Sequence, residues 1–180
     1  MTTQSVYDAA RRQVIQAAAH PHVLYAQPAL DAATALVDEW LTTADRRGVV
    51  ATFRPELASQ LARAALEAVT APYRAIPDEE DAIVLLDAAA TILRARGIDS
   101  TRDGFGVPVP RTPTSPTWGP TGTARLVITC SDAGWGLALD LPSSLVVDVE
   151  AAHDAEGAAA VVDVALAVAG GEYGNPFKVV

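Results

Sequence analysis

The sequence predicts an α+β protein: an N-terminal four-helix antiparallel bundle, a proline-rich strap, and a C-terminal three-stranded antiparallel meander covered by one helix. Apolar residues recur with helical spacing up to about residue 100, and they alternate with polar residues from about residue 125. Five prolines from Pro108 to Pro120 separate the two patterns and exclude a helix or an inner strand there. We therefore expect a helical bundle over 1–100, a linker or strap over 101–122, and a small acidic module over 123–180.

The first two helices are predicted from their start signals and apolar stripes. Ser5 and Asp8 have the spacing of a capping box, so the first helix is expected from about Val6 to Ala19. The second helix is expected to begin at Pro28, because proline suits the first helical position. The apolar stripe of the first helix is Tyr7, Ala10, Val14, Ile15 and Ala18, and that of the second is Leu30, Ala33, Val37, Trp40 and Leu41.

Two further helices complete the predicted bundle. The third is expected to open at Pro55, as the second does at Pro28. The fourth begins with four acidic residues, 78–81, and closes at Gly97, so both of its ends suit the helix dipole. Its buried stripe is Leu85, Leu86, Ala89, Ile92 and Leu93. Because the four helices are amphipathic and closely connected, we expect them to pack on one another.

The region after the prolines predicts three strands and one helix. Residues 125–131 alternate, residues 131–134 form a turn, and further strands follow before a helix over about 154–169 that ends at two glycines. A three-stranded sheet with one apolar face needs a cover, and this alanine- and valine-rich helix can supply it. The residues expected to face inward are Leu126, Ile128, Cys130, Trp135, Leu137, Leu139, Leu141, Leu145, Val147 and Val149.

Charge and cysteine content restrict the class of partner and the compartment. The net charge is −9, with 11 basic and 14 acidic residues over 1–122 and 2 basic and 8 acidic residues over 123–180. This balance argues against nucleic acid or an anionic membrane and favours a protein partner with a basic surface. Cys130 is the single cysteine, and the sequence shows neither a signal peptide nor a membrane-spanning segment. We therefore expect a cytoplasmic protein.

The acidic residues near the third predicted strand are the strongest candidate site. Asp148 and Glu150 alternate with the inward residues, so both should project from the opposite face, and His153 and Asp154 follow. Together the four could hold a divalent metal or act as an acid/base pair. We favour a solvated strand face, with Asp154 as the N-cap of the last helix.

Other potential sites carry weaker signals. His20 and His22 could ligate a metal, but a helix end explains them equally well. Tyr173 and Phe177 follow the glycine stop, and their segment either docks on the body or offers a peptide to a partner. The sequence contains no nucleophile elbow, phosphate-binding loop or dinucleotide fingerprint. We therefore assign no catalytic residue, metal ligand or cofactor.

Three classes of function remain open. The first is a non-catalytic protein-binding protein, such as an inhibitor, immunity-type protein, chaperone or adaptor, binding through Asp148, Glu150, Tyr173 and Phe177. The second is a structural or assembly component, for example of a virus of GC-rich bacteria. The third is a metal-dependent enzyme using Asp148, Glu150, His153 and Asp154. We favour the first class because no sequence motif indicates a reaction.

Overall fold

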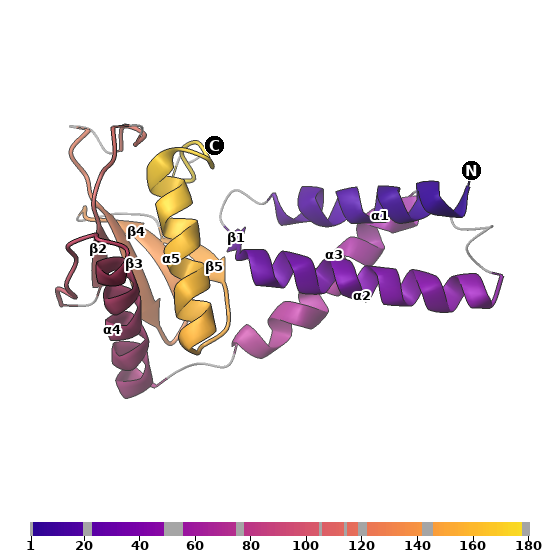
Figure 1. Cartoon of the computed structure of the whole chain (residues 1–180), viewed down its shortest axis with the longest axis horizontal. Helices are drawn as coiled ribbons and strands as arrows, with labels where there is room; N and C mark the ends of the chain where they lie inside the picture. The colour runs from indigo at the N-terminus through magenta and orange to yellow at the C-terminus, as the bar shows by residue number, and fades with distance from the viewer. Residues whose placement is uncertain are drawn as a thin grey trace. The chain divides into compact units, whose positions relative to one another are not determined.

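The computed structural model of the chain is α+β, as predicted (Figure 1). It describes residues 2–19, 23–48, 56–74, 78–104, 106–113, 115–118, 122–141 and 146–177. The chain divides into two units: Met1–His20 with Gln27–Pro72, and Pro21–Ala26 with Tyr73–Val180. Four helices precede most of a five-stranded, mostly antiparallel sheet, and a last helix packs on that sheet.

The first unit is a three-helix assembly with a core of small side chains. It contains α1 (Thr3–Ala18), α2 (Gln27–Arg46) and α3 (Glu56–Thr70), which contact one another, and η2 (Ala71–Arg74) follows α3. An ion pair links α1 to α2, with Arg11 Nη2 2.8 Å from Asp38 Oδ2. Alanine at a helix contact lets the two backbones approach closely. The buried apolar residues are Val6, Ala10, Val14, Ala29, Ala33, Val37, Leu41, Ala58, Ala62, Ala65 and Leu66.

The start and the buried face of α1 differ from the prediction. Thr2 is the N-cap, and its hydroxyl accepts a hydrogen bond from the Ser5 backbone N–H at 3.4 Å. The predicted capping box at Ser5 is therefore wrong, because Ser5 lies inside the first turn. Val6 is buried and Ile15 is 66% exposed, so the core row runs at intervals of four from Val6. The packing of α2 and α3 selects this row from a sequence in which apolar residues occur on neighbouring rows.

The second unit contains the sheet, whose strand order is β1-β5-β4-β3-β2. The predicted meander is confirmed: β3 (Leu126–Ser131), β4 (Gly134–Leu139) and β5 (Val146–Glu150) pair antiparallel in sequence order. Two edge strands extend it beyond the predicted three. β2 (Gly106–Val109) pairs antiparallel with β3, and β1 (Val23–Tyr25) pairs in parallel with β5.

The proline-rich segment is part of this unit and not a separate linker. Pro108 lies in β2, which is an edge strand of the sheet. Proline has no backbone N–H to donate to a neighbouring strand, and an edge strand tolerates this because it has a neighbour on one side only. Ser100 Oγ donates to Pro108 O at 2.6 Å, and Trp118 is fully buried. The prediction that this segment forms no inner strand is confirmed. The expected linker at 101–122 lies inside the second unit, which takes in Tyr73–Val180.

The fourth helix is confirmed, but its partners differ from those predicted. α4 (Glu79–Ala95) packs on α5 (Ala155–Gly170) and on β3, within the second unit. Its expected cap is present, because the Asp78 side chain accepts from the Asp81 backbone N–H at 2.8 Å. Buried leucines in α4, including Leu86 and Leu93, join the apolar cluster of the sheet. These leucines are larger than the alanines that dominate the core of the first unit, and they pack on the valine and leucine side chains of the sheet.

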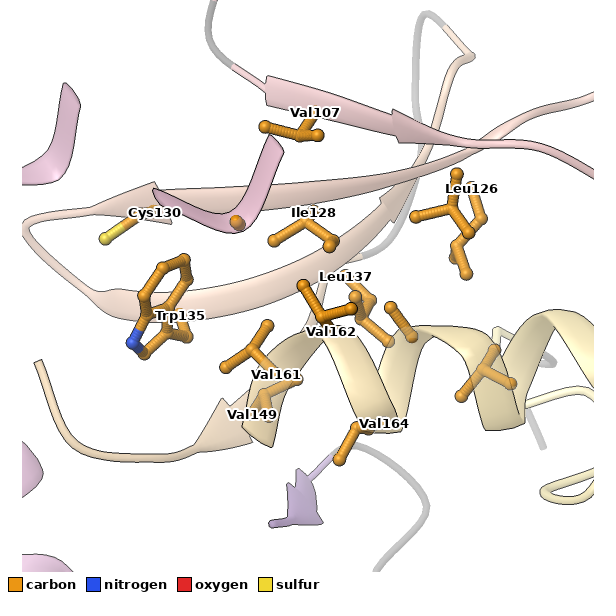
Figure 2. Close-up of a cluster of buried hydrophobic side chains, with 14 of the residues drawn as sticks. Val107, Leu126, Ile128, Cys130, Trp135, Leu137, Val149, Val161, Val162 and Val164 are labelled. Atoms are coloured by element: carbon orange, nitrogen blue, oxygen red, sulfur yellow. The ribbon is translucent and has the colours of Figure 1, made fainter. Parts of the chain in front are cut away.

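The inner face of the sheet, defined as the face toward α4 and α5, holds the main core (Figure 2). Side chains from all five strands join those of α4 and α5 there. Trp135 lies at one end of the cluster beside Cys130. Burying this apolar surface supplies the main stabilisation of the unit. The strand residues predicted to face inward that are buried there are Leu126, Ile128, Cys130, Trp135, Leu137, Leu139, Val147 and Val149. Leu141 packs partly buried against the cluster, and Leu145 lies outside the described residues.

Candidate functional site

The outer face of the sheet, defined as the face opposite α4 and α5, carries the predicted acidic pair. Val147 and Val149 of β5 are buried, at 0% and 4% exposed, whereas Asp148 between them is exposed. Glu150 shares the parity of Asp148 and is half-buried. The alternation of an extended strand therefore places both carboxylates on the outer face, as the sequence predicted.

Strand β1 adds apolar and aromatic groups beside the two carboxylates. In the parallel register, Val23 pairs with Asp148 and Tyr25 pairs with Glu150, so each pair lies on the same face. Leu24 faces the other way and is buried in the core. Sequence analysis missed this part of the face because three residues between two helices are too few to show alternation.

The middle of the outer face is shallow, because a glycine lies between larger neighbours. Gly136 pairs with Asp148 on one side and with Thr129 on the other. A Cβ at Gly136 would lie 2.6 Å from Val146 Cγ1 and 2.9 Å from Thr129 Oγ1, so side chains of both flanking strands lean over the glycine. Val146 itself is 52% exposed. The outer face thus combines exposed apolar surface with carboxylates on one strand, as a protein-binding surface can.

The alternative metal site is not assembled. Asp154 is the N-cap of α5, and its Oδ1 accepts from the Gly157 backbone N–H at 2.7 Å, as predicted. His153 lies near the β3–β4 turn, with Nε2 3.4 Å from the position that a Cβ of Gly134 would take. Within the described ranges, no three His, Cys, Asp or Glu residues gather as metal ligands. His20 and His22 lie outside the described residues.

Cys130 and Trp135 belong to the core. Burial raises the pKa of the Cys130 thiol from 9.0 to about 11, so the reactive thiolate is disfavoured at neutral pH. Trp135 is 2% exposed, and its Nε1–H donates to Ala152 O at 3.0 Å. The prediction of a buried thiol and a core tryptophan is confirmed.

The two predicted aromatic residues differ in their burial. Tyr173 is 46% exposed, and burial together with Glu172 raises the pKa of its phenol. Phe177 packs against the inner-face core and meets Trp118 edge to face, with ring centroids 6.2 Å apart. In the described part of this segment, Phe177 therefore docks on the body, whereas Tyr173 is exposed. Phe177 packs on the inner face and Asp148 projects from the outer face, so these two residues do not share a surface.

Trp118 lies in the proline-rich segment and is among the largest fully buried side chains. No described atom accepts a hydrogen bond from its Nε1–H. A tryptophan in a proline-rich segment was the only available signal, and it does not reveal whether the indole is bonded.

Comparison with known proteins assigns no relative to the chain. No family model matches it, and neither a curated protein nor a solved structure matches it at the significance required. Within the described residues, no helix is both long and apolar enough to cross a bilayer. Function must therefore be argued from the geometry of the chain itself.

Proposed function

We propose that this chain is a non-catalytic protein-binding protein that contacts a basic partner through the outer face around Asp148 and Glu150. The observation that carries the proposal is the alternation in β5, where buried valines alternate with residues of the outer face. The buried valines account for the packing of the strand. Asp148 between them is exposed and contributes less to folding, so we place the contact with the partner around it.

Charge supports a basic partner. Residues 123–180 hold 8 acidic and 2 basic side chains, and one of the two, Arg125, is paired with Asp140 at 2.7 Å. Residues 123–180 therefore carry a net negative charge. A net negative charge of this kind accelerates encounter with a positive partner and repels a negative one.

The test compares two double variants that remove the same charge. Asp148→Asn with Glu150→Gln neutralises the outer face, and Asp99→Asn with Asp132→Asn neutralises two exposed carboxylates elsewhere in the same unit. Each immobilised protein is incubated with lysate of the source cell, and the retained proteins are quantified. We expect at least one protein to be retained by the wild type and the control and depleted about tenfold by the outer-face variant.

The isolated partner then gives the decisive measurement. Its association rate with the outer-face variant should be lower than with the wild type, and the difference should shrink as salt is raised. Equal rates for the two variants would contradict the proposal. A stoichiometric divalent metal in the wild type that the outer-face variant loses would instead favour the enzyme alternative.

A further inference from the structure

The indole N–H of Trp118 is a buried donor that has no acceptor among the described residues. Trp118 is 0% exposed, and no described atom accepts from its Nε1–H. Trp135 provides a matched contrast in the same unit, because its Nε1–H donates to Ala152 O at 3.0 Å. A buried indole usually finds a hydrogen-bond partner, since leaving the donor unpaired forfeits its hydration. The surroundings of Trp118 are thus chemically incomplete.

One aromatic ring from the segment after α5 lies against this indole. Phe177 is half-buried and meets Trp118 with ring planes at 77°, a T-shaped arrangement that aromatic pairs favour. The chain reaches this position after two left-handed glycines, Gly171 (φ +89°) and Gly174 (φ +67°). Phe177 supplies the apolar part of an interaction with Trp118 but no acceptor for the indole.

Few polar contacts hold residues 175–177 in place. Their one hydrogen bond within the described residues is internal, from Phe177 N to Asn175 Oδ1 at 3.1 Å. The last turn of α5 does not depend on them, because Ser115 Oγ donates to Ala169 O at 2.7 Å and Glu172 N donates to Ala167 O at 3.0 Å. Local opening of this segment would leave α5 capped, and it would remove the Phe177 ring from the indole of Trp118.

We propose that Trp118 forms a second binding site, occupied in this chain by its own Phe177, that takes a polypeptide segment with an aromatic side chain and an adjacent carboxylate. Phe177 shows that an aromatic ring fits against the indole, and the Nε1–H, which has no acceptor among the described residues, can take one from the bound segment. A carboxylate is the strongest acceptor that a protein can bring to this donor. Phe177 thus acts as an intramolecular competitor. The proposal is independent of the outer face.

Two synthetic peptides and three forms of the full chain test it. The first peptide is the chain's own segment 174–180, GNPFKVV, and the second, GNPFDVV, places a carboxylate after the phenylalanine. The proteins are the wild type, Phe177→Ala, and the control Tyr173→Ala, which removes an exposed aromatic ring from the same segment. We expect both peptides to bind Phe177→Ala at least about tenfold more tightly than the other two proteins, in which Phe177 competes at high effective concentration.

The carboxylate requirement is tested in the same titration. GNPFDVV should bind Phe177→Ala about tenfold more tightly than GNPFKVV, and adding Trp118→Phe should abolish this difference, because phenylalanine offers no donor. No binding of either peptide to a cooperatively folded Phe177→Ala chain would overturn the site. Equal binding of the two peptides would overturn the carboxylate requirement.

A measurement on the wild type keeps the proposal falsifiable if Phe177→Ala does not fold. The indole N–H of Trp118 should exchange with solvent deuterium at least about tenfold faster than that of Trp135, which is hydrogen-bonded in the core. Equal or slower exchange at Trp118 would mean that the segment does not open locally, and it would overturn the proposal.

Discussion

The two faces of the sheet are built from the same strands but carry different kinds of side chain. On the inner face, β3, β4 and β5 present large apolar side chains such as Ile128, Leu137 and Val147, all 0% exposed. On the outer face, the same strands present Thr129, Gly136 and Asp148 in adjacent register positions. The inner residues share one requirement, which is to fill space beneath α4 and α5. The outer residues vary in size and charge.

This difference separates residues that fold the chain from residues that are available for binding. Inner-face substitutions change the free energy of unfolding through lost burial and cavities. Substitutions at the exposed outer-face positions of β5, Val146 and Asp148, act on groups near solvent, where changes in stability are small, whereas Gly136 on the same face is buried. A partner-binding role is therefore testable on the outer face with little risk of unfolding the protein.

The largest effect is expected at Trp135. Trp135→Ala should lower the free energy of unfolding by about 3–5 kcal/mol, because it removes a buried aromatic ring and its bond to Ala152. Val146→Ala, on the outer face of β5, should change it by less than about 0.5 kcal/mol. Urea unfolding of both variants measures the contrast. Equal losses would show that the outer face is packed as firmly as the inner face.

The second effect is the protection of the Cys130 thiol. A pKa raised to about 11 leaves about a hundredfold less thiolate at pH 8 than the unfolded chain has, so alkylation of the native protein should be at least that much slower. Because the unfolded thiol ionises near pH 9 and the folded thiol near pH 11, stability should fall as pH rises through that window. Rapid alkylation at pH 8 under native conditions would contradict a buried position on the inner face.

The third effect compares the two buried indoles. Trp135→Phe leaves the Ala152 carbonyl without its donor and should cost about 1–3 kcal/mol. Trp118→Phe removes a donor that has no described acceptor, so it should lower the free energy of unfolding by less. Both variants lose the same ring volume, so the difference between the two losses mainly reports the hydrogen bond of Trp135. Thermal or urea unfolding of the two variants provides the comparison. A larger loss at Trp118 would mean that its indole N–H is bonded in solution.

The smallest effect on stability is expected at the acidic pair. Asp148→Asn with Glu150→Gln should change the free energy of unfolding by less than about 1 kcal/mol, because charges near the surface contribute little. Differential scanning calorimetry at low and high salt checks this expectation. A loss comparable to that of Trp135→Ala would assign the two carboxylates to folding and remove the basis for a binding role.

Local signals predicted the parts of the fold that depend on neighbouring residues. Asp78 and Asp154 cap their helices as expected, and the meander follows the alternation of its residues. The sequence also placed Asp148 and Glu150 correctly on the face opposite the core. It missed β1, β2 and the partners of α4, because strand addition and helix docking depend on residues far apart in the chain.

The α+β class, most of the helices, the central meander and the alternation of its two faces follow from periods of 3.6 and 2 in the sequence. Periodicity does not specify that α4 covers the sheet, that β1 lies beside Asp148 and Glu150, or that Phe177 docks on Trp118, because these contacts form only when distant parts of the chain pack together. An apolar stripe predicts that one face of a helix is buried, but it does not predict which other element that face packs on. That choice depends on which surfaces fit one another once the chain has folded.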